Sequence, residues 1–199
     1  LNIDPRAPCL PLTYPAAYAQ ELVAQHGLFS TLGWPEDATG LNEGRLDEDG
    51  FLHQVDEAFT QQEAMTLAAL SKGDDDLFIS VFEATDRVQH LFWRYQDPAH
   101  LLYAPDVEAR YGGEILRWYR RFDSLIGKVL AQLGPEDTLF VLSDHGFKPV
   151  RKWVHLNAWL RDHGYLVART IGAEKRGAHR AEVVWGRTKA YAIGLSKIY

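Results

Sequence analysis

The sequence has a single cysteine, Cys9, among its 199 residues. One cysteine allows no disulfide within the chain and no cysteine-rich zinc finger. No hydrophobic run approaches the roughly 20 residues that a membrane-spanning helix needs. Asp4, Arg6 and several prolines interrupt the start of the chain, so no signal peptide is visible there. These absences leave the cellular location unknown.

Positive charge is also scarce. The chain contains 21 Lys and Arg residues against 27 Asp and Glu residues, which gives a formal net charge of −6. Proteins that track a nucleic-acid polymer are normally basic, so we do not expect this class of partner. A small anionic substrate is still compatible with the charge, because a bound metal ion reverses the sign of the local field.

The length suits one domain, or one domain with an added lobe. The chain begins at Leu1 instead of Met and ends within the apolar stretch Ile198-Tyr199. From these ends we expect an internal piece of a longer polypeptide, in which unpaired sheet edges would favour self-association. We divide it into an N-terminal helical and loop region, residues 1–73, and a portion that carries the candidate site, residues 74–199.

Apolar periodicity and helix-ending residues predict four helices, at residues 15–26, 47–70, 105–133 and 156–163. Residues 28–44 contain several Gly, Pro and Asn residues and are expected to form a loop.

Two short, nearly continuous apolar runs, residues 77–82 and 138–142, are typical of strands covered on both faces. The long helix between them makes a strand–helix–strand unit, which predicts parallel strands in one sheet. Further strands are expected at residues 165–168 and 190–193, with an exposed hairpin or loop over residues 172–186. The fold class is therefore α/β.

Each of the two apolar runs is followed by one carboxylate and one imidazole. Asp86 and His90 follow the first run, and Asp144 and His145 follow the second. The carboxyl ends of parallel strands share one sheet edge, where ligands bind in open α/β folds. Asp86 and His90 lie on one face if their segment is helical, and Gly146 is expected to permit close approach of the second pair.

Either pair alone has an ordinary explanation as a surface pair, but both pairs at one sheet edge favour a metal site. Aspartate and neutral histidine suit zinc, manganese or iron better than calcium. Ser143-Asp144-His145 is not a catalytic triad, because three consecutive residues cannot make the serial hydrogen bonds. His155 is a weaker ligand candidate, and Arg120-Arg121 is interpreted as a solvated helix face.

Three stretches of the sequence, residues 83–95, 143–147 and 156–160, together with the closing residues 187–192, resemble the type I phosphodiesterase/nucleotide pyrophosphatase family of the alkaline phosphatase superfamily. The resemblance runs from about Leu28 to the end. It implies an alkaline-phosphatase-like fold, of which this chain would be a partial domain: a mostly parallel sheet flanked by helices.

In that family two divalent metal ions, most often zinc, flank a Thr or Ser nucleophile. Asp86 and His90 match two ligands of one ion, and Asp144 and His145 match two ligands of the other. The family's nucleophile motif is not found in residues 1–27, so the nucleophile is expected upstream of Leu1. No catalytic residue is therefore assigned in this chain, and the third ligand of each ion is unassigned.

The resemblance implies a phosphoesterase that hydrolyses phosphodiester or nucleotide pyrophosphate bonds by in-line attack at phosphorus with two divalent metals. Its partner would be a small phosphorylated substrate, and the isolated chain is expected to be inactive. Two alternatives stay open: a sulfatase or phosphomutase of the same superfamily, and a non-catalytic interaction domain with the same fold.

Overall fold

The computed structural model describes residues 3–31, 33, 35–152, 154–170, 181–194 and 197–199. The chain divides into two compact units, Leu1–Pro149 and Val150–Tyr199. The sequence boundary after residue 73 falls inside the first unit, between two segments that contribute helices to one core.

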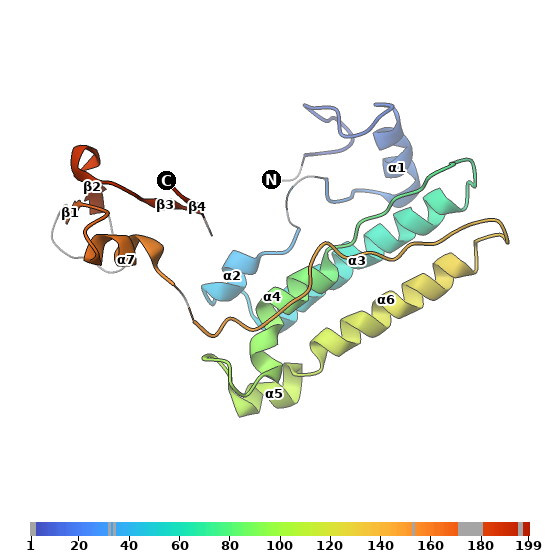
Figure 1. Ribbon diagram of the computed structural model, residues 1–199. Coiled ribbons are helices and arrows are strands. Elements are labelled where there is room, and N and C mark those ends of the chain that lie inside the picture. Colours follow the sequence, from blue (N-terminus) through green and yellow to red (C-terminus); the bar gives the residue numbers. More distant parts are fainter. Residues whose placement is uncertain (1–2, 32, 34, 153, 171–180, 195–196) are drawn as a thin grey trace. The chain divides into compact units, whose positions relative to one another are not determined.

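The first unit is helical (Figure 1). Its helices are α1 (Tyr18–His26), α2 (Ala38–Asn42), α3 (Glu48–Leu70), α4 (Ala84–Gln96), α5 (Pro105–Tyr111) and α6 (Glu114–Leu130). The helices predicted over residues 15–26 and 47–70 are confirmed as α1 and α3. The side chain of Asp47 accepts a hydrogen bond from Gly50 N at 2.8 Å and so caps the N-terminus of α3.

The helix predicted over residues 105–133 is instead two helices, with a break at Gly112-Gly113. A Cβ atom on Gly112 would lie 2.8 Å from the carbonyl oxygen of Glu108 and 3.2 Å from that of Tyr95. At this break the end of α5 approaches the last turn of α4. Only glycine fits there without displacement of the backbone, because it has no Cβ atom.

Helix α2 lies in the segment that was predicted to be a loop. It has five residues, and the side chain of Asp37 accepts a hydrogen bond from Gly40 N at 2.7 Å at its start. A helix this short is too brief to show a 3.6-residue apolar period, so only the capping aspartate marked it.

Helices α3, α4 and α6 pack against one another and bury the core (Figure 1). The largest fully buried side chains are Phe51, Val55, Phe59, Val88, Phe92 and Trp118. The ring of Phe59 lies 5.5 Å from Trp118 and 5.0 Å from Phe122, both edge-to-face. Such aromatic pairs add to the free energy gained by burying apolar surface.

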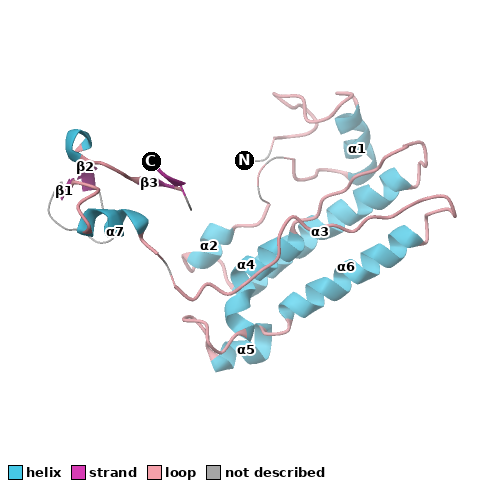
Figure 2. Cartoon of the chain, in the orientation of Figure 1, coloured by secondary structure: helices cyan, strands magenta, loops and turns pink. Residues whose placement is uncertain are grey.

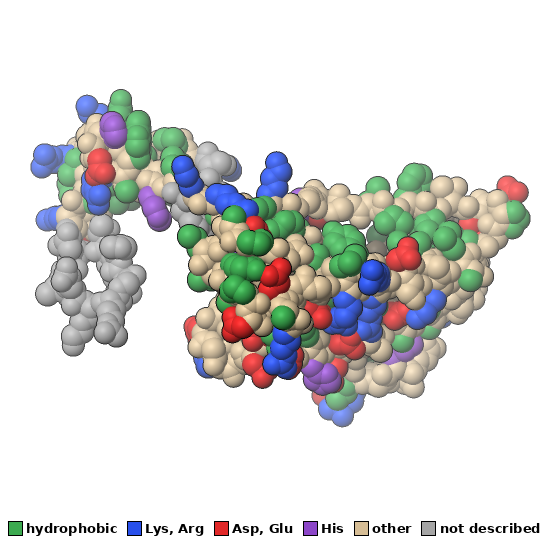
Figure 3. Space-filling model, turned by 90° about the horizontal axis from the view of Figure 1, so that it is seen from below, with side chains coloured by type: hydrophobic (Ala, Val, Ile, Leu, Met, Phe, Trp, Pro, Cys, Tyr) green, Lys and Arg blue, Asp and Glu red, His purple; other side chains and the backbone are tan. Residues whose placement is uncertain are grey.

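Ion pairs join the exposed edges of α3 and α6. Lys128 Nζ lies 2.6 Å from Glu63 Oε1, and Arg121 pairs with Asp56 and donates to Thr60 Oγ1 at 2.7 Å. Figure 3 shows acidic and basic side chains interspersed on one face of the molecule. Partly exposed pairs contribute modest stability each, so the apolar core carries most of the helix packing.

The two segments predicted as strands are extended, but they have no strand partner among the described residues, and Figure 2 draws both as loops. In the first, Phe82 packs on Phe59 and Phe122 at 5.4 and 5.5 Å, whereas Leu77, Ile79 and Val81 are exposed. This alternation is the period of two that a strand shows. The prediction that both faces of these segments are covered was therefore wrong for the described chain: one face of residues 77–82 is exposed, and the side chains of residues 138–142 are exposed throughout.

The second unit is smaller. It contains α7 (Leu156–Asp162), β1 (Ala168–Thr170), β2 (Ala181–Val183), a 3-10 turn (Trp185–Arg187), β3 (Ala192–Ile193) and β4 (Lys197–Ile198). The strands form two antiparallel pairs, β1 with β2 and β3 with β4. The mostly parallel sheet is therefore not found in the described part of the chain.

The predicted helix at residues 156–163 is confirmed as α7. The strands expected at 165–168 and 190–193 begin later, as β1 and β3. Of the hairpin or loop predicted over 172–186, residues 172–180 lie outside the described residues.

Of the helices in the described ranges, none combines the length and the hydropathy that crossing a membrane requires.

A buried phenol links the ends of α3 and α4. The hydroxyl of Tyr95 donates a hydrogen bond to the carboxylate of Glu48 at the start of α3, and the tyrosine side chain is buried. Burial, together with this hydrogen bond, raises the pKa of Tyr95 to about 12. The phenol therefore stays protonated in the folded chain at a pH where an exposed tyrosine ionises.

Leu125→Ala is expected to lower the free energy of unfolding by about 2–5 kcal/mol, because it removes a core side chain that is 4% exposed. Leu116 lies on the same helix and is 54% exposed, so Leu116→Ala should change stability by less than about 0.5 kcal/mol. Urea unfolding followed by circular dichroism compares the two. Equal losses would contradict the assigned core.

Alkaline pH should destabilise the wild-type chain more than the Tyr95→Phe variant. Because the pKa of Tyr95 is raised in the folded state, the folded chain binds the phenolic proton more tightly than the unfolded chain does. Stability from this group is complete below pH 10 and falls between about pH 10 and 12, by about 1.4 kcal/mol per pH unit.

Urea unfolding at pH 8 to 11 measures this difference. Tyr14→Phe serves as the control because Tyr14 is exposed. Parallel pH profiles for the wild type and Tyr95→Phe would disprove the assignment.

Candidate functional site

Helix α4 presents the first of the two predicted ligand pairs. Asp86 stands in its first turn and His90 one turn later, so the helical conformation on which the pairing depended is confirmed. The distance from His90 Nε2 to Asp86 Oδ1 is 3.4 Å. The i, i+4 spacing has therefore placed both side chains on one face of the helix.

The second pair lies against the first. His145 Nε2 is 3.8 Å from Asp86 Oδ1 and 3.5 Å from Asp144 Oδ2. One imidazole nitrogen is thus the common neighbour of two carboxylates that are far apart in the sequence. The structure brings all four predicted residues together, although the segment that carries the second pair is not in a sheet.

Local hydrogen bonds shape the turn around the second pair. Ser143 Oγ donates to the carbonyl oxygen of His145 at 2.6 Å, and His145 N donates to Asp144 Oδ1 at 3.1 Å. The expectation for Gly146 was wrong: a Cβ atom there would meet nothing within 4 Å, so no close approach requires glycine. The side chain of Asp144 is 87% exposed, against 29% for Asp86.

The donor set fits divalent metal ions in its chemistry. Carboxylate oxygen and imidazole nitrogen bind zinc at about 2.0–2.2 Å, and two ligands of one tetrahedral ion then lie ~3.4 Å apart. The separations within the two pairs, 3.4 Å and 3.5 Å, match that value. Among the described residues, however, no group of three or more His, Cys, Asp or Glu side chains is arranged to hold one ion.

Arg87 is a neighbour of the site to which the sequence interpretation gave no role. Its guanidinium donates to Glu83 Oε2 at 2.6 Å and to Asp86 Oδ2 at 3.3 Å, and its Nε lies 3.8 Å from Glu36 Oε2. The side chains of Arg87 and Glu36 are only 10% and 5% exposed. Burial raises the pKa of Glu36, while the nearby guanidinium opposes that shift.

Because of these contacts, the two oxygens of the Asp86 carboxylate have different neighbours. Oδ2 faces Arg87, and Oδ1 faces His90 and His145. A signal for this was present in the sequence, since Glu83 and Arg87 have the i, i+4 spacing of a helical ion pair. Nothing local in the sequence pointed to Glu36.

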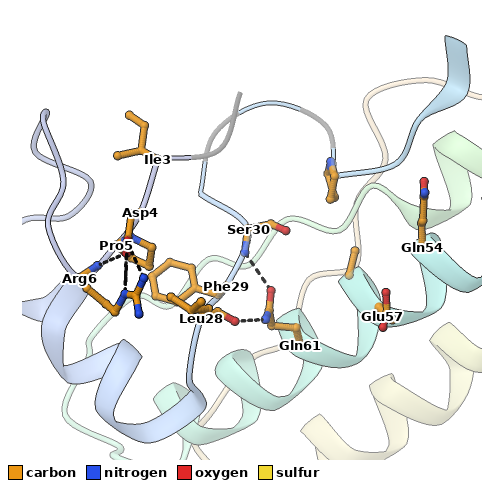
Figure 4. A pocket seen from close by; sticks show the side chains of 12 residues that line it. Ile3, Asp4, Pro5, Arg6, Leu28, Phe29, Ser30, Gln54, Glu57 and Gln61 are labelled. Carbon is orange, nitrogen blue, oxygen red and sulfur yellow. Dashed lines mark hydrogen bonds and ion pairs between the residues drawn. The ribbon is translucent and has the colours of Figure 1, made fainter. Parts of the chain in front are cut away.

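A separate hollow of about 600 Å³ lies between the N-terminal segment and α3 (Figure 4). None of the four candidate ligands lines it. Arg6 pairs with Asp4 at 2.7 Å, and Gln61 accepts from Ser30 N at 3.0 Å and donates to the carbonyl oxygen of Leu28 at 2.7 Å. Its main polar groups are thus engaged with one another, and we assign no function to it.

The sequence model of the family described as Type I phosphodiesterase / nucleotide pyrophosphatase matches residues 13–195, which is nearly the whole chain. The chain belongs to this family. The family is one of hydrolases of the phosphodiesterase and nucleotide pyrophosphatase type, and membership implies an alkaline-phosphatase-like fold. No curated protein and no solved structure matches the chain significantly.

Arg87→Met should destabilise the chain by about 3–5 kcal/mol, because it leaves the buried Glu36 carboxylate without its cation. Arg120→Met, an exposed arginine on α6, is the control and should have little effect. Adding Glu36→Gln to Arg87→Met should recover part of the loss. Urea unfolding at pH 7 measures all four chains, and equal stabilities of the two single variants would contradict the network.

Proposed function

We propose that this protein is a metal-dependent phosphoesterase that hydrolyses phosphodiester or nucleotide pyrophosphate bonds by in-line attack at phosphorus. The observation that carries the proposal is the position of His145 Nε2, next to the carboxylates of both Asp86 and Asp144. Two Asp/His pairs converge in a chain that belongs to a family of phosphodiesterases.

In this proposal Asp86 and His90 hold one divalent ion, and Asp144 and His145 hold the other. Zinc suits the donor set best, with manganese or iron as alternatives. The bound ions would supply activation of a hydroxyl nucleophile and stabilisation of negative charge on the attacking and leaving oxygens. Arg87 keeps Oδ1 of Asp86 directed at the imidazoles by holding Oδ2.

The remaining parts of the proposal concern partners and fold. The substrate is a small phosphorylated compound, and the nucleophile comes from a segment other than these 199 residues. The extended segments at 77–82 and 138–142 are strands of a mostly parallel sheet in the complete domain. Both segments leave apolar side chains exposed, such as Val81 and Phe140, and a neighbouring layer of the sheet would cover these side chains.

We expect the 199-residue chain to bind zinc only weakly and to show no phosphodiesterase turnover, because two protein ligands per ion are fewer than zinc sites normally use. Calorimetric zinc titration should show weaker binding still for His90→Ala and Asp144→Asn. His53→Ala is a matched control: His53 also pairs with an acid four residues away, Glu57 at 3.5 Å, but outside the site.

The same substitutions decide the function in a longer form of the protein that carries the nucleophile. There, His90→Ala and Asp144→Asn should lower kcat on bis-p-nitrophenyl phosphate by at least about 100-fold, while His53→Ala stays within about twofold of the wild type. Turnover by either site variant within a few-fold of wild type would exclude these residues as ligands. Submicromolar zinc binding with turnover by the 199-residue chain would show that the site is complete in it.

A further inference from the structure

The segment that carries Asp144 and His145 has little backbone support. Among the described residues, no backbone hydrogen bond joins residues 138–148 to another segment. Its apolar side chains Phe140 and Leu142 are exposed, at 76% and 86%. Something other than strand pairing must therefore keep the second ligand pair beside α4.

Phe147 makes the ring contacts that the rest of this segment lacks. Its ring centroid lies 4.8 Å from that of His90, with the rings nearly perpendicular, and 6.5 Å from that of Trp93, with the rings nearly parallel. It also lies 5.6 Å from the ring of His145. All three separations fall within the range of roughly 4.5–7 Å over which aromatic rings attract one another edge-to-face or stacked.

The three residues that Phe147 contacts come from two parts of the chain: two belong to α4 and one to its own segment. His90 and Trp93 are three residues apart on α4 and so lie on one face of that helix, and His145 belongs to the segment of Phe147 itself. The phenyl ring thus touches one imidazole from each predicted ligand pair. Those imidazoles are the two whose Nε2 atoms lie 3.4 Å and 3.8 Å from Asp86 Oδ1.

We propose that Phe147 is the positioning residue that seats the Asp144-His145 segment on α4 and orients the imidazoles of His90 and His145 toward the metal ions. This part of the inference rests on the proposed function, whereas the seating itself does not. The polar contact between His145 and Asp86 is not sufficient, because its atoms are 3.8 Å apart and His145 is half exposed, and exposed polar contacts of this kind contribute little. The apolar contact between the rings of Phe147 and Trp93 attaches the segment to α4, because solvent does not weaken such a contact.

The test compares Phe147→Leu with Phe140→Leu in the 199-residue chain. Both substitutions replace a phenyl ring in the same segment, but only Phe147 contacts the imidazoles. Imidazole proton resonances of His90 and His145, assigned with His→Ala variants, report the ring current of Phe147. We expect them to shift toward free-histidine values in Phe147→Leu, to stay near wild type in Phe140→Leu, and to be retained in Phe147→Tyr.

A second variant acts from the other side of the contact. Trp93→Leu removes the stacked partner on α4 without altering the segment, and it should shift the His145 resonances as well. Unchanged imidazole resonances in both Phe147→Leu and Trp93→Leu would overturn the seating, whatever the metal affinity. This result is independent of whether the wild-type chain binds metal.

Cobalt(II) titration, followed by the visible absorption of the bound ion, tests the orientation toward metal. Phe147→Leu should weaken cobalt binding by about tenfold or more, and Phe147→Tyr should restore it. Equal affinities of wild type and Phe147→Leu would overturn the positioning role. Shifted imidazole resonances with no cobalt binding by the wild type would support the seating and overturn the orientation toward metal in this chain, whereas the proposed function is decided separately by the turnover measurements.

Discussion

The burial of one face of α4 is the constraint on which the rest of the site depends. Val88 and Phe92 are fully buried, and Tyr95 lies beside them in the core. A helix turns about 100° per residue, so Asp86 and His90 fall on the opposite face once these apolar positions are fixed. The same rotation turns Trp93 toward the ring of Phe147. Packing of the core, and not any contact among the polar groups, therefore decides that two ligand candidates point outward together.

The sequence predicted the features that depend only on residues close together in the chain. Helix α3 follows from its apolar spacing and from the capping side chain of Asp47, and the pairing of Asp86 with His90 follows from helical spacing alone. The break at Gly112-Gly113 was missed although two adjacent glycines are a local signal for it, whereas the approach of the Tyr95 carbonyl oxygen from another helix could not be read from local sequence. Local periodicity describes one element, whereas the contact that interrupts an element is tertiary.

The predicted parallel sheet is a second case in which local sequence could not specify a tertiary partner. Residues 77–82 have the alternation of a strand, with Phe82 packed inward and Val81 exposed, but a strand is defined by hydrogen bonds to a partner that can come from anywhere in a polypeptide. Convergence of Asp86 and His145 was argued from that sheet, and it occurs without the sheet among the described residues. The ring of Phe147, which the sequence interpretation left without a role, accounts for it.

Two restraints of different kinds act on the candidate site from opposite sides. Arg87, held in turn by Glu36, fixes one oxygen of Asp86 from within the protein, and Phe147 holds the imidazoles from the solvent side. Neither acts on Asp144, whose carboxylate is almost wholly exposed and bonded only within its own turn. The pair on α4 is therefore the better preorganised of the two, and less binding energy is needed to order it around an ion. If the two proposed ions differ in affinity, the tighter one is expected at Asp86 and His90.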